Sequence, residues 1–386
     1  MSRVAVATGV LRWAVERASR SGRSVDKLQK KFPKIGQWLS GESQPTLRQL
    51  EELAKATLTP FGFFFLQEPP EDRMPVPHFR TLRHEAPSKP SPDLLETVQT
   101  MQRRQDWMRE FLIEEGQDPL PFVNSTGIDE EPSSIAQRVR HTVGFDDGWA
   151  AVQPTWTDAL GLFREAVERA GVLVVVNSVV GNNTHRKLDP EEFRGFVLAD
   201  EYAPLMFVNG ADAKAAQMFT LAHELAHVFF GSSAAFDLRQ MLPADDPTEK
   251  ACDRIAAEFL VPERELRQTW PSAQDDPEPF QSIARRFKVS EIVAARRALD
   301  LSLISRKAFL AFYDDYQKSR WPPRPSGGGD FYANQNLRVG RRFACTVTRA
   351  AREGKLLYSE AYQLTGLYGE TFERYAASLE SGERHE

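Results

Sequence analysis

The sequence predicts a mainly α-helical protein with a small β-sheet, an α+β fold in which helical regions flank a central domain. Apolar residues recur at helical spacing along most of the chain. Three short runs rich in β-branched and aromatic residues, 172–178, 193–200 and 204–210, stand together near its middle and are typical of strands. At 386 residues the chain is too long for one compact core, so we expect several domains.

Residues 1–68 are predicted to form a small helical module. Ser24 is a suitable N-cap for one of its helices, and Leu50, Leu53 and Ala54 give another an apolar face. The expected helices cover residues 10–18, 25–31, 35–39 and 46–56, and "PFGFFFL" follows them.

Two stretches are predicted to be linkers. Residues 69–91 are rich in proline and cannot form a regular helix. The stretch "WPPRPSGGGD", residues 321–330, combines proline with a glycine run. We expect a central domain at 92–304 and a helical interaction region at 305–386, which contains the second linker.

In the central domain, helices are expected on both sides of the strands. Asp212 is a candidate N-cap for a helix that ends at Gly231. The strand at 204–210 precedes this helix, and we expect it at a sheet edge, where it could pair with an extended peptide. The other predicted helices cover residues 93–115, 133–143, 155–170, 248–260, 279–287, 290–298 and 305–319, with a helical tail from 331.

The composition excludes several classes of protein. No apolar run approaches the roughly 18 residues that a membrane span needs. Arg12 and Glu16 interrupt the apolar patch near the start, where a signal peptide would be continuous. The two cysteines, Cys252 and Cys345, form no metal or disulfide pattern. We expect a cytoplasmic protein that does not enter a membrane.

The stretch "FTLAHELAHVFFG", residues 219–231, carries the strongest chemical signal. Residues four apart lie on one face of a helix, so His223 and His227 can offer their imidazoles to one metal ion. Glu224 lies beside them, where it can act as general base on a metal-activated water. This pattern favours a site for one zinc ion per chain.

A third ligand is expected on the next helix, in "TEKACDRIAAEFLVP". Glu249 opens that helix, and Asp253 follows on the same face, where it can orient a histidine by accepting a hydrogen bond. Glu258 is an alternative third ligand. Two imidazoles and one carboxylate suit the hydrolysis of a peptide bond, with Tyr202 or His185 as candidate donors to the oxyanion.

Each of these residues also has a simpler interpretation. His223 and His227 could be helix residues without a metal, although burying both beside Glu224 in apolar surroundings would then be costly. Glu249 could be a solvated first-turn residue that the helix dipole favours. Asp253 could be an ordinary surface residue.

The two motifs together resemble the ImmA/IrrE family of bacterial metallopeptidases, also described as DUF955, and "GFVLADEYAPLMFVNG" is similar to the strands before that family's catalytic helix. The resemblance implies a zincin-like, gluzincin-type peptidase domain with zinc ligands His223, His227 and Glu249 and general base Glu224. It also implies an endopeptidase that cleaves a DNA-binding repressor, in stress response or in the control of prophages and other mobile elements.

Longer members of that family carry an Xre-like helix-turn-helix ahead of the peptidase, and residues 1–68 resemble a degenerate form of it. The stretch "LQKKFPKIGQWLSG" is shorter than an Xre unit by about one helical turn, in the half of the recognition helix that reaches base edges. Lys27, Lys30, Lys31 and Lys34 can still contact phosphates without reading sequence. The alternative is a solvated basic face on a protein-interaction module.

The excess of basic residues near the N-terminus supports an alternative class of function. Residues 1–60 hold 11 lysine and arginine residues against 5 acidic ones, although the whole chain has a net charge of −5. The rival is an Xre-like antitoxin or transcription regulator, with a cognate toxin as partner, whose peptidase domain serves mainly for binding. A second basic helical stretch, residues 280–305, is expected to pack on the peptidase domain and to dock substrate.

Overall fold

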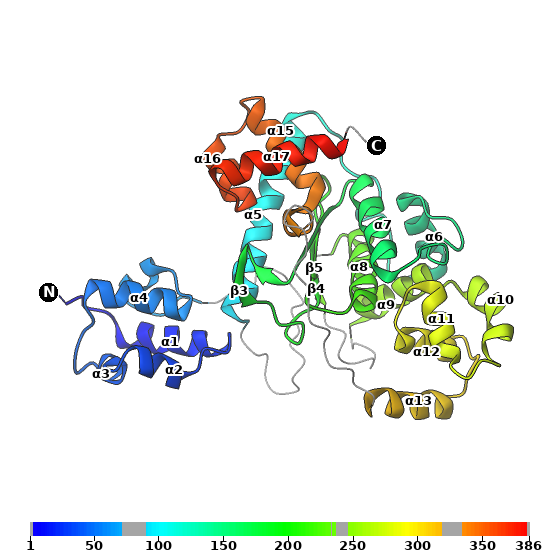
Figure 1. Cartoon of the computed structure of the whole chain (residues 1–386), viewed down its shortest axis with the longest axis horizontal. Helices are drawn as coiled ribbons and strands as arrows, with labels where there is room; N and C mark the ends of the chain where they lie inside the picture. Colours follow the sequence, from blue (N-terminus) through cyan, green and yellow to red (C-terminus); the bar gives the residue numbers. More distant parts are fainter. Residues whose placement is uncertain (1–2, 72–89, 233, 237–245, 319–333, 384–386) are drawn as a thin grey trace. The chain divides into compact units, whose positions relative to one another are not determined.

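The computed structural model describes residues 3–71, 90–232, 234–236, 246–318 and 334–383. Most of the expected linker at 69–91, and all of that at 321–330, lie outside the described residues. The described chain divides into two compact units, one that ends at Thr100 and one that begins at Met101. Figure 1 shows the elements of both. None of the helices described is long and apolar enough to cross a membrane.

The first unit is a small helical module, and it extends past the expected bound at residue 68 to Thr100. Ser24 accepts a hydrogen bond from the backbone N–H of Lys27, and Thr46 forms a capping box with Gln49. Trp38 is buried against Phe32, with ring centroids 5.9 Å apart. The elements are α1 (Thr8–Ser19), α2 (Val25–Lys31), α3 (Ile35–Ser40), α4 (Leu47–Thr57), the 3₁₀ turn η1 (Phe61–Phe65) and the start of α5 (Pro92–Glu114).

The second unit is built on a four-stranded sheet with the order β1-β5-β4-β6. Its strands are β1 (Leu173–Asn177), β4 (Gly195–Leu198), β5 (Leu205–Asn209) and β6 (Ala234–Phe236). β1 runs parallel to β5, while β4 is antiparallel to both β5 and β6. Every residue of β1, β4 and β5 is buried, because helices cover both faces of the sheet.

The helix α8 (Lys214–Phe230) packs on β4 and β5 and also contacts α7 (Trp156–Arg169) and α9 (Pro247–Leu260). In Figure 1, α7 and α8 lie on one side of the sheet, and α5 and α15 (Arg341–Arg352) lie on the other. This arrangement fixes α8 in the centre of the unit, with α9 along its side.

Further elements complete the second unit. A short hairpin joins β2 (Val179–Val180) to β3 (Asn183–Lys187). The helices are α6 (Pro132–Val143), α10 (Glu263–Ala273), α11 (Pro279–Phe287), α12 (Glu291–Asp300), α13 (Arg306–Lys318), the π-helical turn η2 (Asn336–Gly340), α16 (Tyr358–Thr365) and α17 (Gly369–Glu383).

Two expectations about the approach to α8 are wrong. β5 is a central strand, because β1 and β4 pair with its two edges, so it cannot accept a further strand. The N-cap of α8 is Ala213 and not Asp212. The carboxylate of Asp212 instead forms an ion pair with Arg194 at 3.1 Å. Helix α10 was not expected either.

Candidate metal centre

Helix α8 is apolar almost all round, and every residue from Gln217 to Phe229 is buried. Such a helix belongs in the interior of a domain. Within it, His223 and Glu224 are fully buried, and the exposed fraction of His227 is 1%. Three polar side chains at this depth need partners, because an unpaired buried polar group is costly.

The two histidines converge on Glu249, in the first turn of α9. Nε2 of His223 lies 3.2 Å from Oε2 of Glu249, and Nε2 of His227 lies 3.4 Å from Oε1. The two Nε2 atoms are 3.1 Å apart. One nitrogen of each histidine and one oxygen of Glu249 lie within 4.8 Å of one another, which is the spacing of ligands around a single ion.

The outer nitrogen of each imidazole has its own partner. Nδ1 of His223 lies 3.0 Å from Oδ1 of Asp253, and Nδ1 of His227 lies 3.0 Å from Oγ of Ser232. These contacts orient both rings so that the Nε2 atoms face the same point. The sequence predicts the contact of Asp253 but not that of Ser232, which follows the glycine that ends α8.

The charges of this cluster are tightly coupled. Burial would lower the pKa of His223, but hydrogen bonds to Asp253 and Glu249 outweigh it and raise this pKa to about 10. Burial would raise the pKa of Glu249, but hydrogen bonds to both imidazoles hold it well below its usual range. Burial lowers the pKa of His227. In this cluster the positive charge of protonated His223 therefore balances the negative charge of Glu249, as a bound cation would.

Glu224 is the one carboxylate at the site whose two oxygens are buried without a hydrogen-bond partner among the described residues. Burial raises its pKa well above the ordinary value. It lies against Gly195 of β4, where an added Cβ would be 3.0 Å from its Oε1. A buried carboxyl group that is held beside the ligands with unused oxygens suits a proton-transfer role.

Other candidates from the sequence lie elsewhere. Glu258 forms an ion pair with Arg297 and accepts a hydrogen bond from the backbone N–H of Glu263, so it is not directed to the histidines. Tyr202 lies against Arg109 of α5. His185 is exposed on β3. These positions give no support to Tyr202 or His185 as a donor to an oxyanion.

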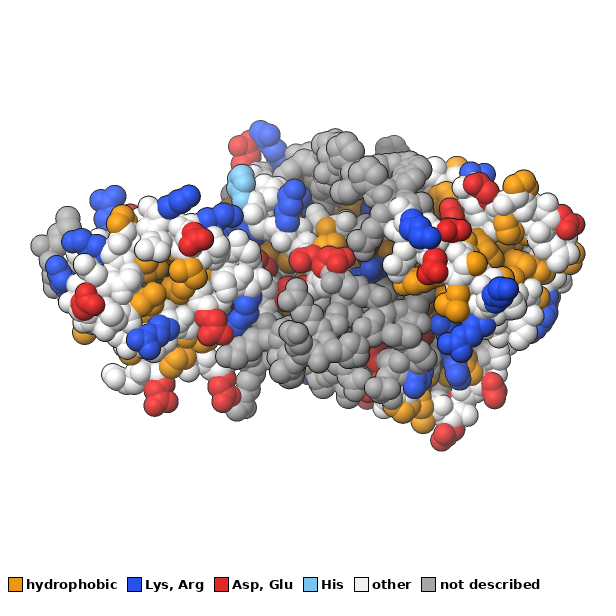
Figure 2. All heavy atoms as spheres, turned by 90° about the horizontal axis from the view of Figure 1, so that it is seen from below, with side chains coloured by type: hydrophobic (Ala, Val, Ile, Leu, Met, Phe, Trp, Pro, Cys, Tyr) orange, Lys and Arg blue, Asp and Glu red, His pale blue; other side chains and the backbone are white. Residues whose placement is uncertain are grey.

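The basic residues predicted to contact nucleic acid are on the first unit. Lys27, Lys30, Lys31 and Lys34 are all exposed on or just after α2. The face of this unit seen at the left of Figure 2 carries basic, acidic and hydrophobic side chains side by side. This mixed surface differs from the continuous basic stripe that is typical of DNA-binding domains.

The second basic stretch, residues 280–305, packs into the main hydrophobic core of the second unit, as expected. Val289, Val293 and Ala298 belong to this core. Arg297 is buried and donates a hydrogen bond to the backbone oxygen of Val261, and Lys288 lies over the ring of Trp156. Arg297 and Lys288 therefore make contacts within the second unit.

Comparisons with known protein families match two parts of the second unit. No curated protein matches the chain. Residues 339–378, which include α15 and α16, match a domain of unknown function, DUF8813. Residues 167–299, which contain the sheet, α8 and α9, match the family model of the IrrE N-terminal-like domain, which belongs to the M78 peptidases.

Proposed function

We propose that the second unit is a zinc-dependent endopeptidase. In this proposal His223, His227 and Glu249 hold one zinc ion per chain, and Glu224 is the general base. The observation that carries it is the convergence of both Nε2 atoms on Glu249 while both Nδ1 atoms are occupied by Asp253 and Ser232. The match of residues 167–299 to a metallopeptidase family supports the same function.

The donor set fits zinc. Neutral imidazole nitrogens and a carboxylate oxygen are ligands that catalytic zinc takes, with a further position left for water. A bound zinc ion supplies a water of pKa about 7 and polarises the carbonyl of the peptide bond. The proposed ligands include no cysteine. Cys252 on α9 is fully buried in the hydrophobic core.

Proton transfer would fall to Glu224. Its oxygens have no competing hydrogen bond among the described residues. A cation held by the neighbouring ligands would favour the ionised form of Glu224, which can accept the proton of the attacking water. It then delivers that proton to the amine that leaves. Asp253 and Ser232 keep the imidazoles in one tautomer through both steps.

The substrate in this proposal is a regulatory protein, a repressor that binds DNA, cleaved in stress response or in mobile-element control. To test it, the full-length chain is incubated with the protein products of the genes that flank its own, and new termini are identified by mass spectrometry. We expect cleavage by the wild type and a loss on the order of 10²- to 10⁴-fold in Glu224→Gln, with unchanged zinc content. Equal cleavage by both proteins would refute the role of Glu224.

A second candidate is a regulator that binds DNA or a cognate toxin through the first unit. Four exposed lysines, three on α2 and one just after it, favour this second function. This function predicts DNA binding that weakens steeply with salt and survives His223→Ala. No measurable affinity for DNA at low salt would exclude the DNA-binding form.

A further inference from the structure

Thr220 of α8 carries a hydroxyl group for which the described residues supply no hydrogen-bond partner. The exposed fraction of its side chain is 1%, and Oγ1 is buried and unpaired. A buried hydroxyl group without a partner costs free energy, so its presence calls for an explanation. One helical turn further along α8 is Glu224, the proposed general base, and both of its oxygens are likewise buried and unpaired.

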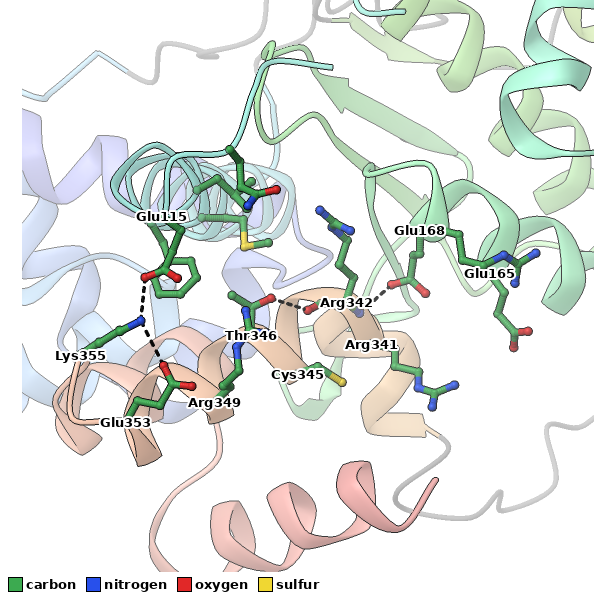
Figure 3. A pocket seen from close by; sticks show the side chains of 15 residues that line it. Glu115, Glu165, Glu168, Arg341, Arg342, Cys345, Thr346, Arg349, Glu353 and Lys355 are labelled. Atoms are coloured by element: carbon green, nitrogen blue, oxygen red, sulfur yellow. Dashed lines mark hydrogen bonds and ion pairs between the residues drawn. The ribbon is translucent and has the colours of Figure 1, made fainter. Parts of the chain in front are cut away.

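In the described helices, the other buried threonines bond their hydroxyl groups within the helix. Each donates to the backbone oxygen of the residue four positions earlier. Figure 3 shows this bond for Thr346 of α15, whose Oγ1 lies 3.0 Å from the backbone oxygen of Arg342. At 2.7–2.9 Å, the same bond is made by Thr57, Thr97, Thr348 and Thr365. The hydroxyl group of Thr220 departs from this pattern, because it makes no such bond to Ala216.

Gly195 of β4 brings Thr220 and Glu224 against the same point. A Cβ placed on this glycine would lie 2.5 Å from Cγ2 of Thr220 and 3.0 Å from Oε1 of Glu224. Residues four apart also share one face of a helix. Because Oγ1 and Cγ2 of threonine are bonded to the same Cβ, a change of χ1 rotamer puts Oγ1 in the position of Cγ2, beside the carboxylate. Threonine divides between two χ1 rotamers in helices, so such a change is open to it.

We propose that Thr220 is a positioning residue for Glu224, an inference that rests on the proposed role of Glu224 as general base. Its hydroxyl group donates a hydrogen bond to a carboxylate oxygen of Glu224 and holds that side chain toward the metal centre. A hydroxyl group suits this task because it donates to an ionised carboxylate and can accept from a protonated one. Glu224 can then keep one orientation while it takes a proton from water and passes it to the leaving amine.

Two substitutions separate the hydroxyl group of Thr220 from its methyl group. Thr220→Val keeps the branched shape and removes the hydroxyl group, whereas Thr220→Ser keeps the hydroxyl group. With a substrate that the wild type cleaves, we expect Thr220→Val to lower kcat about 10- to 100-fold, because one hydrogen bond to a charged group is lost. KM and zinc content should not change. Thr220→Ser should keep a kcat close to that of the wild type.

Thr346→Val is the matched control, since it removes the hydroxyl group of a buried helical threonine on the other side of the sheet. It should cleave substrate as the wild type does. A wild-type kcat in Thr220→Val would overturn the proposal. So would an equal loss of kcat in Thr220→Ser and Thr220→Val, because the hydroxyl group would then not be what positions Glu224.

A crystal structure of the full-length protein tests the same contact without a substrate. We expect Oγ1 of Thr220 to lie about 2.5–3.0 Å from an oxygen of Glu224 in the wild type, and the Glu224 side chain to move in Thr220→Val. A hydrogen bond from Oγ1 to the backbone oxygen of Ala216 would contradict the proposal. If the wild type cleaves no protein, the proposed function fails, while the distance between Thr220 and Glu224 still decides whether the two side chains are coupled.

Discussion

His223 and Glu249 stand on different helices, α8 and α9, yet Nε2 of His223 is 3.2 Å from Oε2 of Glu249. The packing of α9 along α8 makes this contact, and α8 is in turn held on β4 and β5. Glu249 is therefore positioned by the fold of the whole unit, and removing it should affect metal binding more than folding.

Glu249→Ala should lower the affinity for zinc on the order of a hundredfold or more, because the site loses its charged ligand. Competition with a chelator of known affinity measures this. Glu263→Ala, at an exposed glutamate near the start of α10, is the matched control and should bind zinc as the wild type does. If Glu249→Ala keeps wild-type affinity, Glu249 is not a ligand.

Asp253→Asn and Ser232→Ala should each lower zinc affinity, the first by about 10- to 100-fold, because the charged partner also makes the imidazole more basic. Ser232→Ala removes a neutral partner of His227, so we expect a smaller loss. The same chelator competition ranks the two. A larger loss in Ser232→Ala than in Asp253→Asn would contradict this assignment.

Zinc binding should release a proton. The pKa of His223 is raised to about 10, while His227 is already neutral and Glu249 already ionised near pH 7. The metal must displace the proton of His223, so apparent affinity should rise about tenfold per pH unit between about pH 7 and about pH 9.

Zinc-buffered titrations at several pH values measure this slope. Asp253→Asn removes the charge that helps to raise the pKa of His223, so its slope should be shallower. A flat dependence in the wild type would show that His223 carries no proton in the metal-free protein.

Gly195→Ala should reduce peptide cleavage by more than about tenfold and leave zinc content near one per chain. Its Cβ would lie 2.5 Å from Cγ2 of Thr220, 2.8 Å from the backbone oxygen of Phe207 and 3.0 Å from Oε1 of Glu224. It would therefore displace Glu224, the proposed general base. Such overpacking also costs about 1–3 kcal/mol of stability.

Gly161→Ala in α7 is the control, since an added Cβ there meets no atom within 4 Å. It should cleave substrate at the wild-type rate. Unchanged cleavage by a folded Gly195→Ala protein would show that this glycine does not position Glu224.

The sequence predicts local structure well where signals are local. Helices α2 and α11 have the expected bounds, because Ser24 caps α2 and Pro279 begins α11. The sequence does not predict helix α10, because Pro262 and Pro271 are typical of a loop; in the structure Pro262 is its N-cap and Pro271 lies inside it.

Long-range pairing was harder to predict. The position of β5 inside the sheet depends on β1 and β4, and the neighbouring β6 comes from beyond α8. None of these pairings leaves a local pattern in the sequence. The order of elements along the chain therefore wrongly suggests that β5 lies at the edge of the sheet. The contact between Ser232 and His227 is likewise seen only in the structure. Gly231, with a φ of 65°, turns the backbone so that Ser232 comes back toward His227. A hydroxyl residue directly after such a glycine is the signal that could have indicated it.

The central claim is that one zinc ion lies between His223, His227 and Glu249. Anomalous diffraction at the zinc edge, from crystals of the full-length protein purified without chelator, tests it most directly. We predict one peak per chain, about 2.0–2.1 Å from both Nε2 atoms and about 2.0–2.2 Å from an oxygen of Glu249. A peak elsewhere, or no peak at these residues, would contradict the account.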